Sequence, residues 1–195
     1  MIKLSILIPT VHEREELLNT LVNSLTAQAT GLPVEIIHLS DNKEISIGEK
    51  RKQLYNKASG LYSVQVDDDD MLASTYIVDV LDAIDTKPDC VGYLEEINCN
   101  ETKKIACHSN RFSDWGTNQD GYDYVRTIFF KDVINTEIAR KTGVRDIRFG
   151  EDHDFAKRLK LSGLLQREFF IDKTMYFYTQ TILTPQEHKS RYGIK

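Results

Sequence analysis

The chain has 195 residues, of which 41% are hydrophobic and 28% are charged, and its formal net charge is -5. This length suits one domain with its own core, and the acidic balance argues against a large nonspecific nucleic-acid surface. No apolar run approaches the roughly 20 residues of a membrane span, and the opening MIKLSILIPT is too short and strand-like for a signal peptide. Cys90, Cys99 and Cys107 lack CxxC spacing, so we expect free thiols in a cytoplasmic protein.

Residues 1–85 are predicted to alternate strand and helix three times. The strands are the apolar runs at 4–8, closed by Pro9, at 34–39 and at 61–66. Apolar residues at helical spacing predict helices over 17–25, ending near Gly31, and over 48–58 and 72–84. Such alternation is typical of parallel strands joined by right-handed crossovers, with helices on both faces of the sheet.

Residues 86–195 are less regular. We expect antiparallel strands at 90–96 and 103–108, a polar loop over 109–124, a strand near 125–130 and a helix ending at Gly143. A helix over 151–162 stops at Gly163, and the last predicted strands are 165–171 and 175–180. The fold class predicted for the single domain 1–195 is therefore α/β, with a mixed, mainly parallel sheet flanked by helices.

Polar residues follow each of the three predicted parallel strands, where ligands bind in sheets of this kind. They are Pro9-Thr10, Ser40-Asp41-Asn42 and the four aspartates at 67–70. Asp67 and Asp69 share a side if the chain is extended there, and oxygen ligands suit Mg²⁺ or Mn²⁺. The alternative is an acidic turn in which Asp69 or Asp70 caps the next helix, although four acids exceed what a cap needs.

Taken in order, several segments resemble the family 2 glycosyltransferases, which have the GT-A fold. The opening strand LSILIPT, the second strand EIIHLSDN, the segment GEKRKQLYNKASGLYSVQVDDDD and the segment GEDHDFAKRL carry the resemblance. A DxD motif alone is a weak signal, but its order with Arg51, Gly60 and Glu151-Asp152 on an α/β pattern is much more specific. PTVHERE departs from the aromatic-Asn usual after the first strand, and the absence of QxxRW disfavours processive polysaccharide synthesis.

The resemblance implies a role for each matching residue. Thr10 and Asp41 would contact the nucleotide base beside Pro9, and Asp67, Asp68 and Arg51 would hold the rest of the nucleotide sugar. The metal would be bound by Asp69 with Asp67, and His188 is the candidate to complete its shell. Asp152 would be the catalytic base with Glu151 as the alternative, and Trp115 would stack on an acceptor sugar.

Ordinary structural roles stay open for three of these residues. A first-turn acid such as Asp152 is favoured by the helix dipole, Trp115 is a possible packing anchor, and His188 lies in a polar tail.

The function implied is transfer of a sugar from a nucleotide sugar, expected to be a UDP-sugar, to an acceptor hydroxyl. A divalent cation neutralises the charge on the leaving diphosphate, and one positioned base contributes about 10²- to 10⁴-fold, so a single inverting displacement follows. Residues 1–85 would form the nucleotide-sugar-binding half and 86–195 the acceptor-binding and catalytic half. A nucleotidylyltransferase of related fold and a non-catalytic sugar-nucleotide or glycan-binding module are the alternatives. The acceptor is open among a glycan, a protein, a small molecule and a modified nucleic-acid base.

Overall fold

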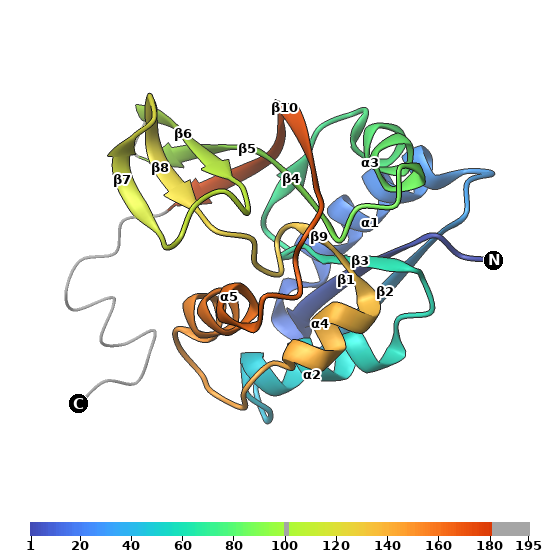
Figure 1. The fold of residues 1–195 in the computed structure, drawn as a ribbon. Helices are drawn as coiled ribbons and strands as arrows, with labels where there is room; N and C mark the ends of the chain where they lie inside the picture. The colour runs from blue at the N-terminus through green and yellow to red at the C-terminus, as the bar shows by residue number, and fades with distance from the viewer. Residues whose placement is uncertain (100–101, 181–195) are drawn as a thin grey trace, which may run out of the picture.

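A computed structural model describes residues 1–99 and 102–180, so the predicted metal ligand His188 lies outside the described residues. The described strands form one sheet in the order β2-β1-β3-β9-β5-β6-β8-β7, with β10 pairing with β4 and β5 (Figure 1). The strands are β1 (Leu4–Val11), β2 (Val34–Asp41), β3 (Tyr62–Gln65), β4 (Met71–Leu72), β5 (Cys90–Cys99), β6 (Thr102–His108), β7 (Gly116–Gln119), β8 (Tyr122–Arg126), β9 (Val133–Asn135) and β10 (Glu168–Gln180). The helices are η1 (His12–Arg14), α1 (Glu15–Ala29), α2 (Ile47–Lys57), α3 (Tyr76–Asp85), α4 (Thr136–Thr142) and α5 (Glu151–Ser162).

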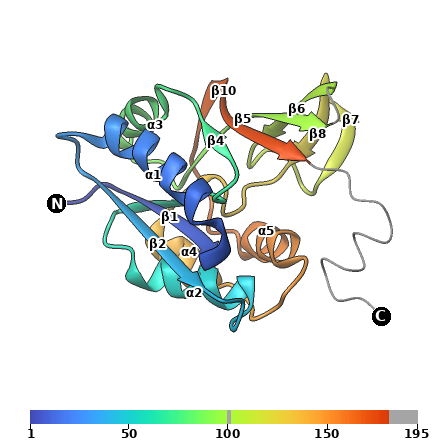
Figure 2. The same cartoon turned by 180° about the vertical axis from the view of Figure 1, so that it is seen from behind.

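The first half confirms the predicted parallel arrangement, since β1 pairs in parallel with both β2 and β3. Helices α1 and α3 cover one face of these strands, and α2 and α4 cover the other (Figures 1 and 2). Side chains of β1 alternate between the faces: Leu4, Ile6 and Ile8 join one core cluster, and Leu7 joins the other. Two hydrophobic layers therefore hold the sheet, and its carboxyl edge stays free for polar residues.

Strand β1 continues through Pro9 to Val11, whereas the sequence predicted that it ends at Pro9. Proline is tolerated because β3 pairs with β1 only as far as Leu7. Beyond Leu7, the side of β1 that faces β3 has no strand partner within the described part of the chain, so the missing N–H of Pro9 costs little there. The extra residues carry Thr10 to the end of the sheet.

A close contact between two backbones fixes the start of β3. The Gly60 N–H donates to Ser5 Oγ at 2.8 Å, and a Cβ on Gly60 would lie 2.7 Å from the Ser5 backbone nitrogen. Only glycine fits there without shifting β1. Gly60 therefore sets the register that brings the aspartates after β3 beside the end of β1.

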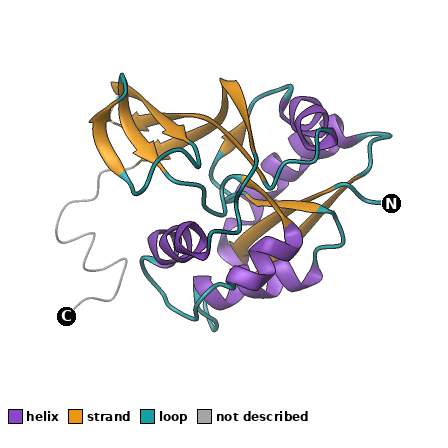
Figure 3. Cartoon of the chain, viewed as in Figure 1, coloured by secondary structure: helices purple, strands orange, loops and turns teal. Residues whose placement is uncertain are grey.

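In the second half, β5 and β6 pair antiparallel as predicted, but the expected polar loop contains the hairpin of β7 and β8. Asp120 and Gly121 form its two-residue turn, with φ of 54° and 83°. An Asp-Gly pair is a strong hairpin signal because both positions need positive φ, so this element was predictable and was missed. Strands β5 to β8 gather at one end of the molecule, whereas β1, β2 and β3 lie among the helices (Figure 3).

Three other boundaries were predicted wrongly. Strand β8 stops at Arg126, and a separate three-residue strand, β9, follows it. The two final strands are one, β10, whose pairing with β5 is irregular between Ile171 and Tyr176. Helix α3 begins only at Tyr76, because Met71–Leu72 pairs with β10 as β4.

The helix start also answers the capping question. The N-cap position of α3 is Thr75, so Asp69 and Asp70 are too far upstream to cap it, and that expectation was wrong. The cysteine prediction is confirmed for Cys90 and Cys107, which are buried free thiols. Within residues 1–99 and 102–180, no helix combines the length and apolar character needed to cross a bilayer.

Candidate active site

The four aspartates form a tight turn between β3 and β4. The Asp70 N–H donates to the Asp67 carbonyl at 3.1 Å, so the chain forms a turn at residues 67–70, where an extended chain was predicted. The alternation that would place Asp67 and Asp69 on one side therefore does not apply. Side-chain exposure divides the four instead: 29% for Asp67, 2% for Asp68, 43% for Asp69 and 1% for Asp70.

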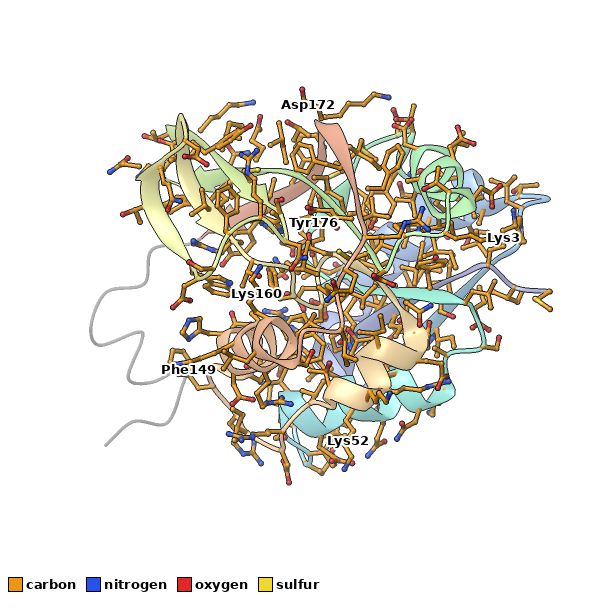
Figure 4. All side chains as sticks on the ribbon, viewed as in Figure 1. Lys3, Lys52, Phe149, Lys160, Asp172 and Tyr176 are labelled. Atoms are coloured by element: carbon orange, nitrogen blue, oxygen red, sulfur yellow. The ribbon has the colours of Figure 1, made fainter. Side chains whose placement is uncertain are left out.

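Asp70 is held from beneath by a buried cation and a buried phenol. Lys131 donates to its carboxylate at 2.9 Å and Tyr176 at 2.5 Å. Tyr176 comes from β10 and lies in the middle of the molecule (Figure 4). Burial raises the pKa of Asp70 to about 6, although Lys131 opposes the shift. The lysine also lies 3.8 Å from Asp67 and 3.7 Å from Glu95, so it supports the underside of the turn.

Arg14, from η1, neutralises the outer part of the turn. Its guanidinium donates to Asp68 at 2.7 Å and lies 3.2 Å from Asp69. The second Asp68 oxygen accepts from Thr10 Oγ1 at 2.5 Å. Thr10, predicted to contact a nucleotide base, therefore also fastens β1 to the turn.

Arg51 joins the turn to the segment predicted to be catalytic. From α2 it donates to Asp67 at 2.8 Å, to Gln65 at 3.2 Å and to Glu151 at 3.3 Å. Its guanidinium also lies 3.9 Å from the ring centroid of Phe130. Burial alone would lower the pKa of Arg51, but the Asp67 and Glu151 carboxylates raise it. The structure thus brings together three residues that the sequence placed in the site.

Glu151 and Asp152 open α5 after Gly150, yet their environments differ. Glu151 is buried, its pKa is raised by that burial, and it is committed to Arg51. Asp152 is half-buried and accepts from the His153 N–H at 2.7 Å. Among the described residues, no basic side chain forms an ion pair with Asp152. Of the two, Asp152 is the acid without a cationic partner among the described residues.

Asp41 lies beside Thr10 at the ends of β2 and β1, in the register Val11↔Asp41. The Lys50 ammonium bonds to both the Asp41 carboxylate and the Thr10 carbonyl. Burial raises the pKa of Asp41, but the bond to Lys50 lowers it overall. The two residues predicted to contact the base are therefore neighbours, and Lys50 joins them.

A buried polar cluster beneath the turn was missed. His108 bonds to Asp132 at 3.0 Å and to Glu95 at 3.2 Å, and Glu95 lies beside Lys131. Burial lowers the pKa of His108, but the two carboxylates raise it to about 9. The adjacent charges Lys131-Asp132 inside the apolar run IFFKDVI were the available signal, because charges buried in such a run need partners.

Trp115 is packed among aromatic and cationic side chains. Its ring centroid is 5.2 Å from those of Phe129 and His153, and the Arg126 guanidinium carbon lies 4.7 Å from it. Arg126 therefore occupies space over the ring on which a sugar was predicted to stack. This supports the packing role, and it places Trp115 beside the residue that follows Asp152.

The described residues contain no group of three His, Cys, Asp or Glu side chains arranged to hold a metal ion. Asp69 is the most exposed carboxylate of the turn, and it shares Arg14 with Asp68. Mg²⁺ typically takes one or two carboxylates together with substrate phosphates. The donor set therefore fits an ion that is bound jointly with a phosphorylated ligand, through Asp69.

The sheet order, the crossovers and the acidic turn at the carboxyl edge define the GT-A fold. Similar solved structures include those of S. aureus TarS. The structure of TarS residues 1–349 in complex with UDP-GlcNAc matches at a TM-score of 0.66 and 17% identity, over 94% of this chain and 60% of that one. The structure of the same TarS residues in complex with UDP matches at the same TM-score and identity, over 97% of this chain and 63% of that one. A structure titled simply TarS matches at 0.63 and 17% identity, over 97% of this chain and 38% of that one.

At this identity the likeness establishes the fold. The chain spans 60% of the first of these structures. Comparison of sequences alone matches no family model and no curated protein.

Proposed function

We propose that the protein is a family 2 glycosyltransferase that moves a sugar from a UDP-sugar to an acceptor hydroxyl with inversion. The observation that carries the proposal is the contact of Arg51 with both Asp67 and Glu151, at 2.8 and 3.3 Å. This guanidinium brings the acidic turn and the start of α5 together at the carboxyl edge of the sheet. The binding of UDP and UDP-GlcNAc by TarS, which has the same fold, supports the choice of donor.

The donor half of the proposed site consists of residues from the ends of β1, β2 and β3. The nucleotide contacts Thr10 and Asp41, beside Pro9, and Asp67 lies on its ribose or diphosphate side with Arg51 close by. The prediction for Asp68 is corrected, because its side chain is buried and both of its oxygens are bonded to Arg14 and Thr10, so it holds the turn in place. Mn²⁺ or Mg²⁺ would be held by Asp69, with Asp67 and His188 as the other predicted ligands. When bound, the ion neutralises the charge that develops on the leaving diphosphate.

The acceptor half is formed by the start of α5 and the strands beside it. Asp152 removes the proton of the acceptor hydroxyl as its oxygen attacks the anomeric carbon. Its lack of an ion pair among the described residues supports this assignment, because a base held by a cation is weakened. Glu151 keeps α5 fixed to Arg51 and is the alternative base. A single base opposite the leaving group gives inversion.

A donor screen tests the proposal without an identified acceptor. The protein is incubated with Mn²⁺ and each of a UDP-, a GDP- and a TDP-sugar, and release of free nucleotide by slow hydrolysis is measured. We expect UDP to be released from a UDP-sugar and the rate to fall in Asp152→Asn. Release of pyrophosphate from UTP and a sugar phosphate would instead identify a nucleotidylyltransferase. Tight binding of a UDP-sugar without any hydrolysis would identify a non-catalytic binding module.

A further inference from the structure

Arg126, the last residue of β8, is held rigidly between aromatic rings. Its guanidinium carbon lies 4.7 Å from the Trp115 ring centroid and 5.1 Å from that of Tyr124. One terminal nitrogen, Nη1, donates to the carbonyls of Val125 at 2.9 Å and Gly116 at 3.3 Å. These contacts fix the plane of the guanidinium.

The other two nitrogens of Arg126, Nε and Nη2, make no hydrogen bond within residues 1–99 and 102–180. In the same part of the chain, no carboxylate lies within ion-pair distance of this arginine. The other basic side chains around the turn, Arg14, Arg51 and Lys131, each pair with an aspartate. Nε and Nη2 together form the fork that binds a carboxylate or phosphate in two parallel hydrogen bonds.

The pKa of Arg126 shifts in the opposite direction to the pKa values of Arg51 and Lys131. Burial lowers the pKa of the Arg126 guanidinium, and the carboxylates of Glu95 and Asp152 offset this only in part. For Arg51 and Lys131, close carboxylates more than compensate for burial, and the pKa is raised. A half-buried cation without a paired anion is unfavourable, so an incoming anion would offset part of that cost.

The position of Arg126 links it to the proposed acceptor side. Its β6 partner in the sheet register is His108, which bonds to Glu95 under the acidic turn. On the other side, Trp115 contacts His153, the neighbour of the proposed base. Asp152 is close enough to act on Arg126 electrostatically without pairing with it.

From these contacts we infer that Arg126 binds an oxyanion, a phosphate or a carboxylate, carried by the acceptor, and so orients the acceptor hydroxyl toward Asp152. The assignment of the anion to an acceptor rests on the proposed function. The anion site itself rests only on the geometry of Arg126. The acceptor class is therefore an anionic one. Arg126 is a positioning and specificity residue, and the bond chemistry remains with Asp152.

The experiment uses Trp115 as a reporter, because it is the single tryptophan of the chain. Its buried indole N–H has no hydrogen-bond partner among the described residues, so a ¹⁵N NMR signal from it responds to changes at Arg126. Inorganic phosphate and acetate are titrated separately against potassium chloride at matched ionic strength, with and without saturating UDP and Mg²⁺. We expect a saturable shift with one or both anions, and the stronger of them identifies the acceptor group.

Variants separate a specific site from general electrostatics. Arg126→Met is expected to weaken anion binding at least tenfold, and Arg126→Lys, which keeps the charge but not the fork, to weaken it less. Arg111→Met is the control, since Arg111 lies over Phe112 in the loop between β6 and β7 and is exposed. Far-ultraviolet circular dichroism checks folding, and Arg126→Lys keeps the test valid if the methionine variant does not fold.

Three results would overturn the inference: no saturable shift in the wild type, equal binding in Arg126→Met, or displacement of bound phosphate by UDP, which would make Arg126 part of the donor site. Calorimetry of UDP binding is run in parallel. If calorimetry detects no UDP binding, the proposed function is wrong, but the anion titration still shows whether Arg126 binds an anion.

Discussion

The Arg51 guanidinium lies 2.8 Å from the Asp67 carboxylate and 3.3 Å from that of Glu151, so one buried cation joins the turn after β3 to the first turn of α5. These elements are distant in sequence, and the proposed donor and acceptor sides meet at this residue. The geometry of the site therefore depends on a contact that neither segment could make alone.

Arg51→Met should destabilise the fold as well as the site. It removes the cation and leaves the half-buried Asp67 and the buried Glu151 without their partner, and breaking a buried pair typically costs about 3–5 kcal/mol. Urea denaturation followed by circular dichroism measures the free energy of unfolding. The exposed Arg148→Met is the control and should change that energy by less than about 0.5 kcal/mol. Equal stability of the two variants would mean that the Arg51 contacts do not hold the site together.

The stability of the protein should fall in alkaline solution because of His108. Its pKa is raised from 6.5 to about 9 by Asp132 and Glu95 despite burial. The stabilisation is thus complete below about pH 6.5 and is lost as the pH rises through about 9, and the shift corresponds to on the order of 3 kcal/mol.

Thermal unfolding between pH 6.5 and 9.5 measures this effect. We expect His108→Gln to be less stable than the wild type at pH 6.5 and to lose much less stability on going to pH 9.5. The exposed His38→Gln should follow the wild-type curve. An unchanged alkaline loss in His108→Gln would show that another group titrates.

Much of this architecture was predictable because it depends on local patterns. The period of apolar residues predicted α1 and α5, and the alternation of elements predicted that β1, β2 and β3 are parallel. The order of Arg51, Asp67 and Glu151 in the sequence suggested one site, and the structure brings the three together. The Asp-Gly hairpin turn was also a local signal, although it was missed.

Other features depend on partners far away in the sequence. Strand β4 has two residues and exists only because β10 pairs with it, so no local pattern indicated it. The same holds for the cations of the acidic turn, since Arg14 and Lys131 come from opposite parts of the chain. Repulsion among four aspartates required some cation, but it could not identify which ones.

Asp152→Asn should retain donor binding and lose transfer. The amide keeps the shape of the side chain but cannot take up the proton, so hydrolysis of the donor should slow by about 10²- to 10⁴-fold. Calorimetry with UDP and a nucleotide-release assay measure the two properties. Asp172→Asn, an exposed residue at the irregular bend of β10, is the matched control (Figure 4). Normal turnover in Asp152→Asn would transfer the role of base to another residue, with Glu151 the first to test.

Arg14→Gln should strengthen metal binding in the absence of nucleotide. Arg14 lies 3.2 Å from Asp69 and competes with any cation for that carboxylate. Because both side chains are partly exposed, the gain should be modest, about two- to fivefold in affinity. Titration calorimetry with Mn²⁺ alone gives the value, and Lys43→Gln, which removes an exposed pair with Glu13, is the control. Weaker Mn²⁺ binding in Arg14→Gln would show that Arg14 organises the carboxylates for the ion.

The most direct measurement is the affinity for UDP with and without Mn²⁺, compared between the wild type and Asp69→Asn. We predict weak UDP binding without metal, because the acidic turn repels the diphosphate, and at least tenfold tighter binding with metal in the wild type. Asp69→Asn should lose most of that gain while unfolding at the same temperature as the wild type. Tight UDP binding that is indifferent to both the metal and Asp69 would contradict a donor site at the turn after β3.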